Sequence, residues 1–375
     1  MEFVVKIHSR CNLACDYCYI YEMADQSWRE QPRTMSRQVF ADACRMIGEH
    51  ARRFALPAVD LVFHGGEPLL AGHRNLEYFA RQARELLEPN TEVRLGMQTN
   101  GTLLDAEFLR ICDESGIQIG VSIDGSEDGH DRHRRDRRGA GSYARVTAGL
   151  GQLLAADRRH LFSGLLCTIE VANDPVETYE ALAKFRPPAI DFLLPHGNWT
   201  TPPPALTVGD PATPYADWLI AVFDRWYHAP TFETHVRLFD DIIDLLLGGQ
   251  PTSEAVGLAP IRLAVIETDG TLEQVDELKS TFAGATRLLL EGEGNPLDQA
   301  LREPSMVARQ IGVAALSDTC RACPVRAVCG GGHYAHRYRA DNGFRNPSVY
   351  CSDLQKLIYH IESRIRADVD TAIST

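Results

Sequence analysis

The sequence lacks any long apolar run. No stretch approaches the roughly eighteen consecutive apolar residues from which a membrane-spanning helix is built. A signal peptide is excluded as well, because residues 1–6, MEFVVK, have strand-like character from the first position. We therefore predict a cytoplasmic protein that has no membrane partner.

The sequence also has fewer basic than acidic residues. The chain has 38 Lys and Arg residues against 51 Asp and Glu residues, which gives a formal net charge of −13. Such an acidic surface argues against a nucleic-acid partner, because the phosphate backbone would be repelled. We expect the chain to act on another class of molecule.

Cysteine is absent between Cys167 and Cys320, and most of the ten cysteines gather in two groups outside this gap. In a cytoplasmic protein, clustered cysteines bind metal more often than they form disulfides. Cys44, Cys112 and Cys167 lie apart from the two groups, in apolar helical or strand contexts. We predict that these three are inert buried thiols.

The first cysteine group follows directly after an apolar strand. Cys11, Cys15 and Cys18 have the spacing C-x-x-x-C-x-x-C. Three thiolates from one loop can hold a 4Fe-4S cube and leave its fourth iron open to the amino and carboxylate groups of S-adenosylmethionine (SAM). This spacing is the radical SAM signature. A zinc knot is the alternative, but structural zinc needs four closed ligands, and no fourth Cys or His follows at knuckle spacing.

Apolar, β-branched runs alternate with helical patterns through the first part of the chain. Six such alternations call for parallel strands with right-handed crossovers, which predicts an α/β fold with an open, partial (β/α)6 barrel. Ligands of such folds gather at the carboxyl ends of the strands. The predicted strands cover residues 3–8, 60–64, 93–98, 117–123, 162–169 and 189–194, and the predicted helices cover residues 36–54, 74–87, 105–115, 142–158, 174–185 and 214–227.

Polar motifs stand at the ends of these strands. The second strand ends in Gly65-Gly66-Glu67, where glycine lets the backbone approach a ligand closely and leaves its N–H and C=O groups available. The third strand ends in residues 98–101, QTNG, and the fourth in residues 122–125, SIDG. The charge run at residues 130–138 reads as a solvated loop, from which one arginine can clamp a carboxylate.

Together with the late cysteine group, these motifs resemble the radical SAM/SPASM family of peptide and protein maturases. The resemblance implies a radical SAM barrel with a C-terminal SPASM-like domain. It implies that Cys11, Cys15 and Cys18 bind the SAM-cleaving cluster. It also implies contacts with the rest of SAM: Tyr17 against the adenine, Gly65, Gly66 and Glu67 on the methionyl amine, Ser122 and Arg134 on the carboxylate, and Leu194 either on the adenine or in the core.

The late cysteines match one auxiliary cluster of that family. Cys320, Cys323, Cys329 and Cys351 correspond to the outer cluster, while every ligand of the inner one is missing and His333 stands where the last cysteine of the run would be. The resemblance therefore implies two 4Fe-4S clusters, one that binds SAM and one auxiliary. Four cysteines at this spacing would also make a closed zinc site, which stays an alternative.

We expect a bridging helix at residues 236–250 between a barrel at residues 1–235 and the SPASM-like domain at residues 251–375. A closing helix is predicted at residues 352–372 from apolar residues at helical spacing. Residues 266–276 read as a hairpin that turns at Asp269-Gly270. By the resemblance, Asp276 after this hairpin is the carboxylate that takes a substrate proton, and a surface aspartate is the alternative. His196 is either a catalytic or a satisfied loop histidine.

The late residues 329–334 and 340–351, with residues 192–199, resemble the FxsB-type branch, whose relatives form cyclophanes in ribosomally made (RiPP) peptides. The resemblance implies an oxidoreductase that abstracts hydrogen from a precursor peptide and installs a Cβ-to-aryl C–C crosslink. Thioether or formylglycine formation, as in the sulfatase-maturing relatives, is an alternative, and a non-catalytic Fe-S carrier or peptide chaperone is another. The expected partners are the peptide and an electron donor such as flavodoxin or ferredoxin. Because a strand begins at Met1, we expect no N-terminal leader-binding domain, and the leader is read by the barrel side or by a separate protein.

Overall fold

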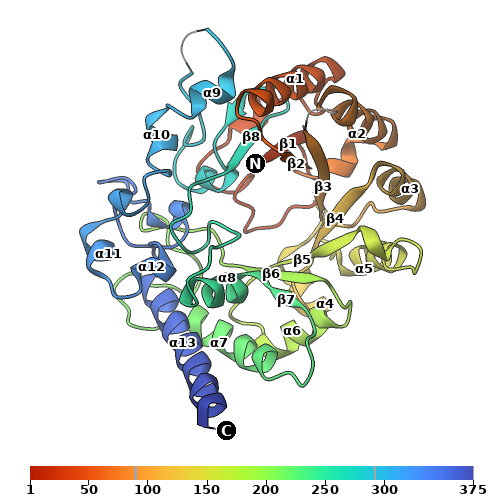
Figure 1. Ribbon diagram of the computed structural model, residues 1–375. Helices are drawn as coiled ribbons and strands as arrows, with labels where there is room; N and C mark the ends of the chain where they lie inside the picture. Colours follow the sequence, from red (N-terminus) through yellow and green to blue (C-terminus); the bar gives the residue numbers. More distant parts are fainter. Residues whose placement is uncertain (88–90, 291–292, 375) are drawn as a thin grey trace. The chain divides into compact units, whose positions relative to one another are not determined.

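The computed structural model describes residues 1–87, 91–290 and 293–374 (Figure 1). The chain divides into two compact units, each built from segments that are separate in sequence. The first unit comprises Met1–Ile123, His130–Leu166 and Arg262–Val307, and the second comprises Asp124–Gly129, Cys167–Ile261 and Ala308–Thr375.

The first unit is organised by a mostly parallel sheet. Its strands lie in the order β5-β4-β3-β2-β1-β8-β9, and all neighbours are parallel except the antiparallel pair β8 and β9. Buried alternate residues of β1, such as Phe3, Val5 and Ile7, place this strand in the core. The strands are β1 (Glu2–His8), β2 (Ala58–Gly65), β3 (Glu92–Thr99), β4 (Ile117–Ser122), β5 (Phe162–Thr168), β8 (Leu263–Ile266) and β9 (Leu272–Glu273).

Helices of the first unit begin at recognisable caps. Ser36 accepts a hydrogen bond from the N–H of Val39 at the start of α1, and Asp105 does the same for Phe108 at the start of α3. Figure 1 shows α1 and α2 along the outside of the first strands. The helices are α1 (Arg37–Arg53), α2 (His73–Leu87), α3 (Ala106–Ser115), α5 (Tyr143–Leu153), α9 (Pro296–Ala300) and α10 (Pro304–Val307).

The second unit contains the short parallel pair β6 (Ala189–Leu193) and β7 (His235–Val236) and a set of helices. Tyr215 and Tyr350 are fully buried and meet edge to face, with ring centroids 5.0 Å apart, which packs α7 against the start of α13. The helices are α6 (Pro175–Ala183), α7 (Pro214–Tyr227), α8 (Arg237–Leu246), α11 (Asp318–Ala322), α12 (Arg326–Cys329) and α13 (Cys351–Ser374).

Short 3-10 turns complete the fold, at Ser27–Arg29, Pro68–Ala71, Arg159–Leu161, Asp276–Ser280, Gly312–Ala315 and Tyr334–Arg337. Among the residues that the structure describes, no helix has both the length and the apolar character needed to cross a membrane. Cys44, Cys112 and Cys167 are buried as predicted, and burial raises the pKa of the Cys44 and Cys112 thiols to about 12.

The six predicted strands and the six predicted helices all exist, with ends that differ from the prediction by at most five residues. One expectation was wrong. The first part of the charge run is not a loop, because α4 (Glu127–His133) is helical. Acidic Glu127 and Asp128 stand in its first turn and basic His130, Arg132 and His133 in its last, so the charges complement the helix dipole.

The hairpin predicted at residues 266–276 is present as β8 and β9, with Gly270 at a positive φ of 91° in the turn. Its first strand pairs in parallel with β1, so that Val265 lies opposite Val4. This pairing brings Arg262–Val307 into the first unit. The predicted domain limits at residues 235 and 250 stay a prediction, although α8 lies within the predicted bridging helix.

Candidate active site

The three-cysteine loop leaves the carboxyl end of β1, and all three cysteines are half-buried. The backbone N–H of Leu13 points to Cys11 Sγ at 3.4 Å, and the side-chain amide of Asn100 reaches the same sulfur at 3.7 Å. Burial raises the pKa of Cys11 to about 12 and also raises that of Cys18. Thiols in this setting become thiolates when a metal replaces their protons, and N–H donors to sulfur then stabilise the added charge.

Two glycines after β2 allow this loop to pack closely. Gly65 has a φ of 138°, and a Cβ there would clash with the carbonyl oxygen of His8. A Cβ on Gly66 would clash with the Tyr21 hydroxyl and with the backbone of Arg10. The glycines are therefore required by the close approach of two backbones. The predicted contact of this turn with the methionyl amine stays a prediction.

Glu67 is fully buried and ties the ends of two strands together. Its carboxylate accepts hydrogen bonds from Thr99 Oγ1 at 2.7 Å, from the Asn100 N–H at 2.8 Å and from the Leu69 N–H at 3.1 Å. Burial raises the pKa of Glu67 to about 7, because desolvation outweighs these hydrogen bonds. The side chain is thus occupied by protein donors, which leaves the backbone of this turn as the group that could grip a ligand amine.

A small amide network links the end of β3 to the cysteine loop. Asn100 Nδ2 donates to Asn12 Oδ1 at 2.9 Å, Asn12 Nδ2 donates to Thr102 Oγ1 at 2.8 Å, and Thr102 Oγ1 donates to Asn100 Oδ1 at 2.6 Å. The sequence alone indicated no role for the strand end at residues 98–101. The structure shows that Asn100 in this strand end binds Asn12, which directly follows Cys11, and this pair of asparagines was not predicted.

The residues predicted to hold the adenine and carboxylate are partly brought together. The Arg134 guanidinium lies 5.6 Å from the centre of the Tyr17 ring, in cation–π range, and is nine-tenths buried. Ser122 Oγ accepts a hydrogen bond from Gln98 Nε2 at 2.9 Å. Leu194 follows β6 in the second unit. The roles of these four residues in SAM binding stay predictions.

Asp276 is not a surface residue, so that alternative was wrong. The residue is 5% exposed, and its carboxylate lies 2.6 Å from Lys6 Nζ, which also binds Glu267 Oε1 at 2.6 Å. Lys279 Nζ lies 2.7 Å from Glu267 and 2.9 Å from Glu273. Burial opposes ionisation of Glu267, yet the two ammonium groups lower its pKa to about 2. The three carboxylates of Glu267, Glu273 and Asp276 thus face the two ammonium groups of Lys6 and Lys279, and we refer to these five residues as the charged cluster. With one negative charge in excess, the charged cluster can accept one proton.

The four late cysteines gather in the second unit around one cavity of about 240 Å³. Gln355 Nε2 points to Cys323 Sγ at 3.3 Å, and burial raises the pKa of Cys329 and Cys351 to about 11. Mainly apolar surface surrounds the sulfurs. Four convergent thiols in such a cavity fit a closed metal site, and the auxiliary 4Fe-4S cluster proposed for them stays a prediction.

Comparison with known proteins fits this geometry. Residues 5–185 match the family model of the Radical SAM superfamily. A serine-type anaerobic sulfatase-maturating enzyme of Bacteroides thetaiotaomicron is 24% identical over 379 residues, covering 94% of this chain and 86% of the relative. A cysteine-type enzyme of Clostridium perfringens is 22% identical over 373 residues, covering 95% of each.

The fold has a close counterpart among solved structures. A structure described as native anSMEcpe with bound AdoMet and Cp18Cys peptide superimposes with a TM-score of 0.83 at 20% identity, covering 99% of both chains. The predicted α/β fold of radical SAM type is confirmed. The match of residues 5–185 to the Radical SAM superfamily fits the predicted cofactors, SAM and 4Fe-4S. The cysteine loop, the strand-end motifs around it and the family match thus identify residues 5–185 as a domain of the Radical SAM superfamily.

Proposed function

We propose that this enzyme is a maturase that abstracts a hydrogen atom from a side chain of a peptide or protein. The observation that carries the proposal is the combination of a three-cysteine loop with a separate four-cysteine cavity in one chain. The likeness to sulfatase-maturating enzymes, one of them solved with a bound peptide, supports the substrate class. Bound SAM, reduced by one electron at the cluster, supplies a 5'-deoxyadenosyl radical that takes hydrogen from unactivated carbon.

The residues of the first unit have distinct parts in this proposal. Cys11, Cys15 and Cys18 hold the cluster, and the Arg134 guanidinium with its planar fork is suited to the SAM carboxylate. Tyr17, held beneath Arg134, offers a ring face to the adenine. The amide network of Asn12 and Asn100 fixes the loop against the end of β3. Each of these residues positions the cofactor before the substrate arrives.

The product that we propose is a crosslink from a β-carbon to an aryl ring of the same peptide, a cyclophane. The substrate first loses a hydrogen atom from Cβ. The carbon radical then bonds to the ring, and one proton and one electron leave. The charged cluster around Asp276 takes the proton, and the electron leaves through the auxiliary cluster or returns to the SAM-binding cluster. The peptide becomes lighter by two hydrogens.

Formylglycine is the second candidate, because sulfatase-maturating enzymes align over nearly the whole chain. Oxidation of serine to an aldehyde also removes two hydrogens, so intact mass alone does not separate it from a crosslink. Oxidation of cysteine to the same aldehyde exchanges sulfur for oxygen and gives a different mass. A thioether would form without an aryl ring and would consume a cysteine thiol. A separate leader-binding protein stays part of the proposal for a ribosomally made substrate.

The test is an anaerobic assay of the reconstituted enzyme with SAM, dithionite and the precursor peptide encoded beside it. A crosslinked product is lighter by two hydrogens, resists fragmentation between two residues and does not react with a hydrazide probe. An aldehyde product reacts with the probe and fragments normally. Release of 5'-deoxyadenosine without a change in any peptide tested would contradict the proposed substrate class, and absence of 5'-deoxyadenosine would contradict SAM cleavage itself.

A further inference from the structure

Three histidines of the second unit lie together although they are distant in sequence. His196 follows β6, His333 precedes the turn Tyr334–Arg337, and His336 lies within that turn. One ring nitrogen of each can be chosen so that all three lie within 4.8 Å of one another. The ring centroids are 5.0 to 5.6 Å apart. We refer to His196, His333 and His336 as the histidine triad.

The triad has buried ring nitrogens that need a partner. His336 is only 3% exposed. Within the described part of the chain, the Nδ1 atoms of both His333 and His336 are buried and find no hydrogen-bond partner. A buried polar atom left in this state costs about 1–3 kcal/mol, so native proteins usually supply a partner, a water or an ion. The triad therefore points to something bound between its rings.

The rings are in the protonation state that binds metal. Burial lowers the pKa of His196 to about 4, and burial together with neighbouring positive charges holds the pKa of His333 and His336 well below the usual range. All three imidazoles are thus neutral near pH 7, and the neutral imidazole is the form that ligates metal ions. Mutual repulsion between protonated rings does not arise.

The distance between one ring nitrogen of His336 and one of His196 matches the distance between two ligand atoms on the same metal ion. His336 Nε2 lies 3.3 Å from His196 Nδ1. Two nitrogens at about 2.0–2.1 Å from a tetrahedral zinc ion are about 3.4 Å apart, which matches this spacing. A hydrogen bond between two neutral imidazoles would explain this pair as well, but it would engage only two of the three rings and would leave Nδ1 of His333 without a partner. Nδ1 of His336 lacks a partner with either arrangement.

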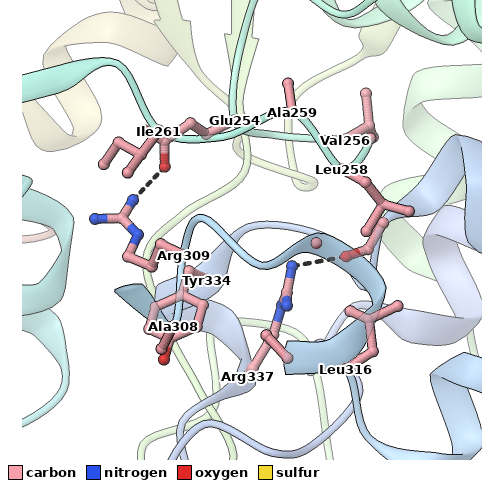
Figure 2. A pocket seen from close by; sticks show the side chains of 14 residues that line it. Glu254, Val256, Leu258, Ala259, Ile261, Ala308, Arg309, Leu316, Tyr334 and Arg337 are labelled. Atoms are coloured by element: carbon pink, nitrogen blue, oxygen red, sulfur yellow. Dashed lines mark hydrogen bonds and ion pairs between the residues drawn. The ribbon is translucent and has the colours of Figure 1, made fainter. Parts of the chain in front are cut away.

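Two arginines, Arg309 and Arg337, lie close enough to His333 for their charges to lower its pKa. Figure 2 shows both arginines in the wall of a pocket. Arg309 forms an ion pair with Glu254, which neutralises its charge. Arg337 donates to the carbonyl oxygens of Gly330 at 2.8 Å and Gly332 at 2.6 Å, so it keeps its charge while its hydrogens are occupied. Both guanidinium groups lie over the Tyr334 ring, at 5.4 and 5.5 Å from its centre. The remaining positive charge of Arg337 favours an anionic fourth ligand, such as hydroxide, on a bound cation.

We propose that the histidine triad binds one divalent transition-metal ion, with zinc as the best match, separately from the iron–sulfur sites. Imidazole ligands suit zinc and its neighbours in the first transition row, whereas magnesium and calcium need oxygen ligands, which this set does not supply. Three protein ligands leave a fourth coordination position for water, hydroxide or a substrate group. The site does not depend on the proposed peptide chemistry.

The test uses the full chain with its iron–sulfur clusters reconstituted. The protein is incubated with zinc sulfate, passed through a desalting column, and examined by elemental analysis and by X-ray absorption at the zinc edge. We expect about one zinc per chain, with nitrogen or oxygen neighbours at about 2.0 Å and no sulfur neighbours at about 2.3 Å. This distinction separates the triad from zinc held by the four late cysteines.

Variants locate the ion. His336→Gln and His196→Gln should each lower the retained zinc at least tenfold while iron content stays at the wild-type level, which shows that the chain is folded. His50→Gln is the matched control, because His50 is equally buried and pairs with Asp298 in the first unit. It should retain zinc. Absence of retained zinc in the wild type, a shell of sulfur neighbours, or full retention in both triad variants would overturn the proposal.

Should His336→Gln fail to fold, His196→Gln provides the same test from outside regular secondary structure, after the end of β6. Cobalt(II) offers a second readout, since a tetrahedral nitrogen site gives a high-spin signal in electron paramagnetic resonance that zinc lacks. The signal should appear in the wild type and in His50→Gln and vanish in His196→Gln. A cobalt signal that survives in His196→Gln would overturn the assignment of the ligands.

Discussion

The two cysteine groups of this chain are built differently. Cys11, Cys15 and Cys18 lie on one partly exposed loop, and polar donors from the end of β3 hold that loop in place. The late group has four cysteines that converge on a cavity with mainly apolar walls. Three ligands on a loop leave a metal position open, whereas four convergent ligands close it. The comparison suggests a reactive cluster in the first unit and a supporting cluster in the second.

The buried side chains of the two units also differ in charge. The first unit buries Glu67 and the charged cluster, which contains Lys6, Glu267 and Asp276. The second buries neutral imidazoles and mainly apolar side chains around its cysteines, together with single charged groups such as Arg337 that are held by hydrogen bonds instead of a cluster of opposite charges. Buried charge raises the cost of losing any one partner, because the remaining group stays unpaired in a low dielectric. Substitutions should therefore have different consequences in the two units.

The largest effect should follow from Cys15→Ala. Loss of one of only three ligands removes the SAM-binding cluster, so 5'-deoxyadenosine formation should fall by at least about a thousandfold and iron by about four atoms per chain. Cys44→Ala, which removes a fully buried thiol outside both groups, is the control and should keep both quantities. Equal loss in the two variants would show that unfolding, rather than cluster loss, is responsible.

Cys329→Ala tests the late cysteine group in the same way. The variant should also lose about four iron atoms, yet dithionite-driven SAM cleavage should persist within a few-fold of wild type, because the first cluster is intact. Formation of modified peptide should fall more than SAM cleavage does. Parallel assays of 5'-deoxyadenosine and peptide mass check this. Loss of SAM cleavage in a folded Cys329→Ala protein would break the distinction between the two groups.

Lys6→Met tests the buried charges of the first unit. Removal of the ammonium leaves Glu267, Glu273 and Asp276 facing Lys279 alone, which should lower the free energy of unfolding by about 3–5 kcal/mol at pH 7. Denaturant unfolding of the reconstituted protein measures it. Lys356→Met is the matched control: its ion pair with Asp217 is exposed at the surface and should be worth less than about 1 kcal/mol. Similar losses in the two variants would contradict the account of the cluster.

Glu67→Gln should have the smallest effect of the four and a characteristic pH dependence. The amide nitrogen of glutamine cannot accept from the Asn100 N–H, which should cost about 1–3 kcal/mol at pH 5. Because the folded pKa of Glu67 is raised to about 7, the contribution of this carboxyl to stability falls as pH rises from about 4.3 toward 7. The deficit of the variant should therefore shrink by pH 8, as measured by unfolding at both values. A stability deficit that grows with pH would contradict this assignment. Glu107→Gln is the control, because Glu107 is exposed and its replacement should change the free energy of unfolding little at either pH.

Much of the fold could be predicted from local sequence patterns, whereas the parts that depend on non-local contacts could not. The apolar runs of β1 to β6 and caps such as Asp105 could be found in the sequence, because each depends on neighbouring residues. The four-residue strand β8 pairs with β1 across about 260 residues, and its own pattern cannot reveal that partner. α4 was missed because a run of charges indicates solvent exposure but does not report how the charges fit a helix dipole.

The candidate site shows the same division. Cysteine spacing indicated the cluster loop directly, since the chemistry needs those residues within a few positions of one another. The ion pair of Lys6 with Asp276 and the meeting of His196 with His336 join residues 270 and 140 positions apart. Only the folded chain brings such pairs together, and this is why Asp276 could not be told from a surface aspartate in the sequence.

The most direct test of the central claim is electron–nuclear double resonance of the reduced protein with SAM labelled with nitrogen-15 at its amine. An open iron in the three-cysteine cluster binds that amine, so a nitrogen-15 coupling should appear in the wild type and persist in Cys329→Ala. It should be absent in Cys15→Ala. No coupling in the reduced wild type, or a coupling that depends on Cys329 instead of Cys15, would contradict the account of an open cluster in the first unit and a closed one in the second.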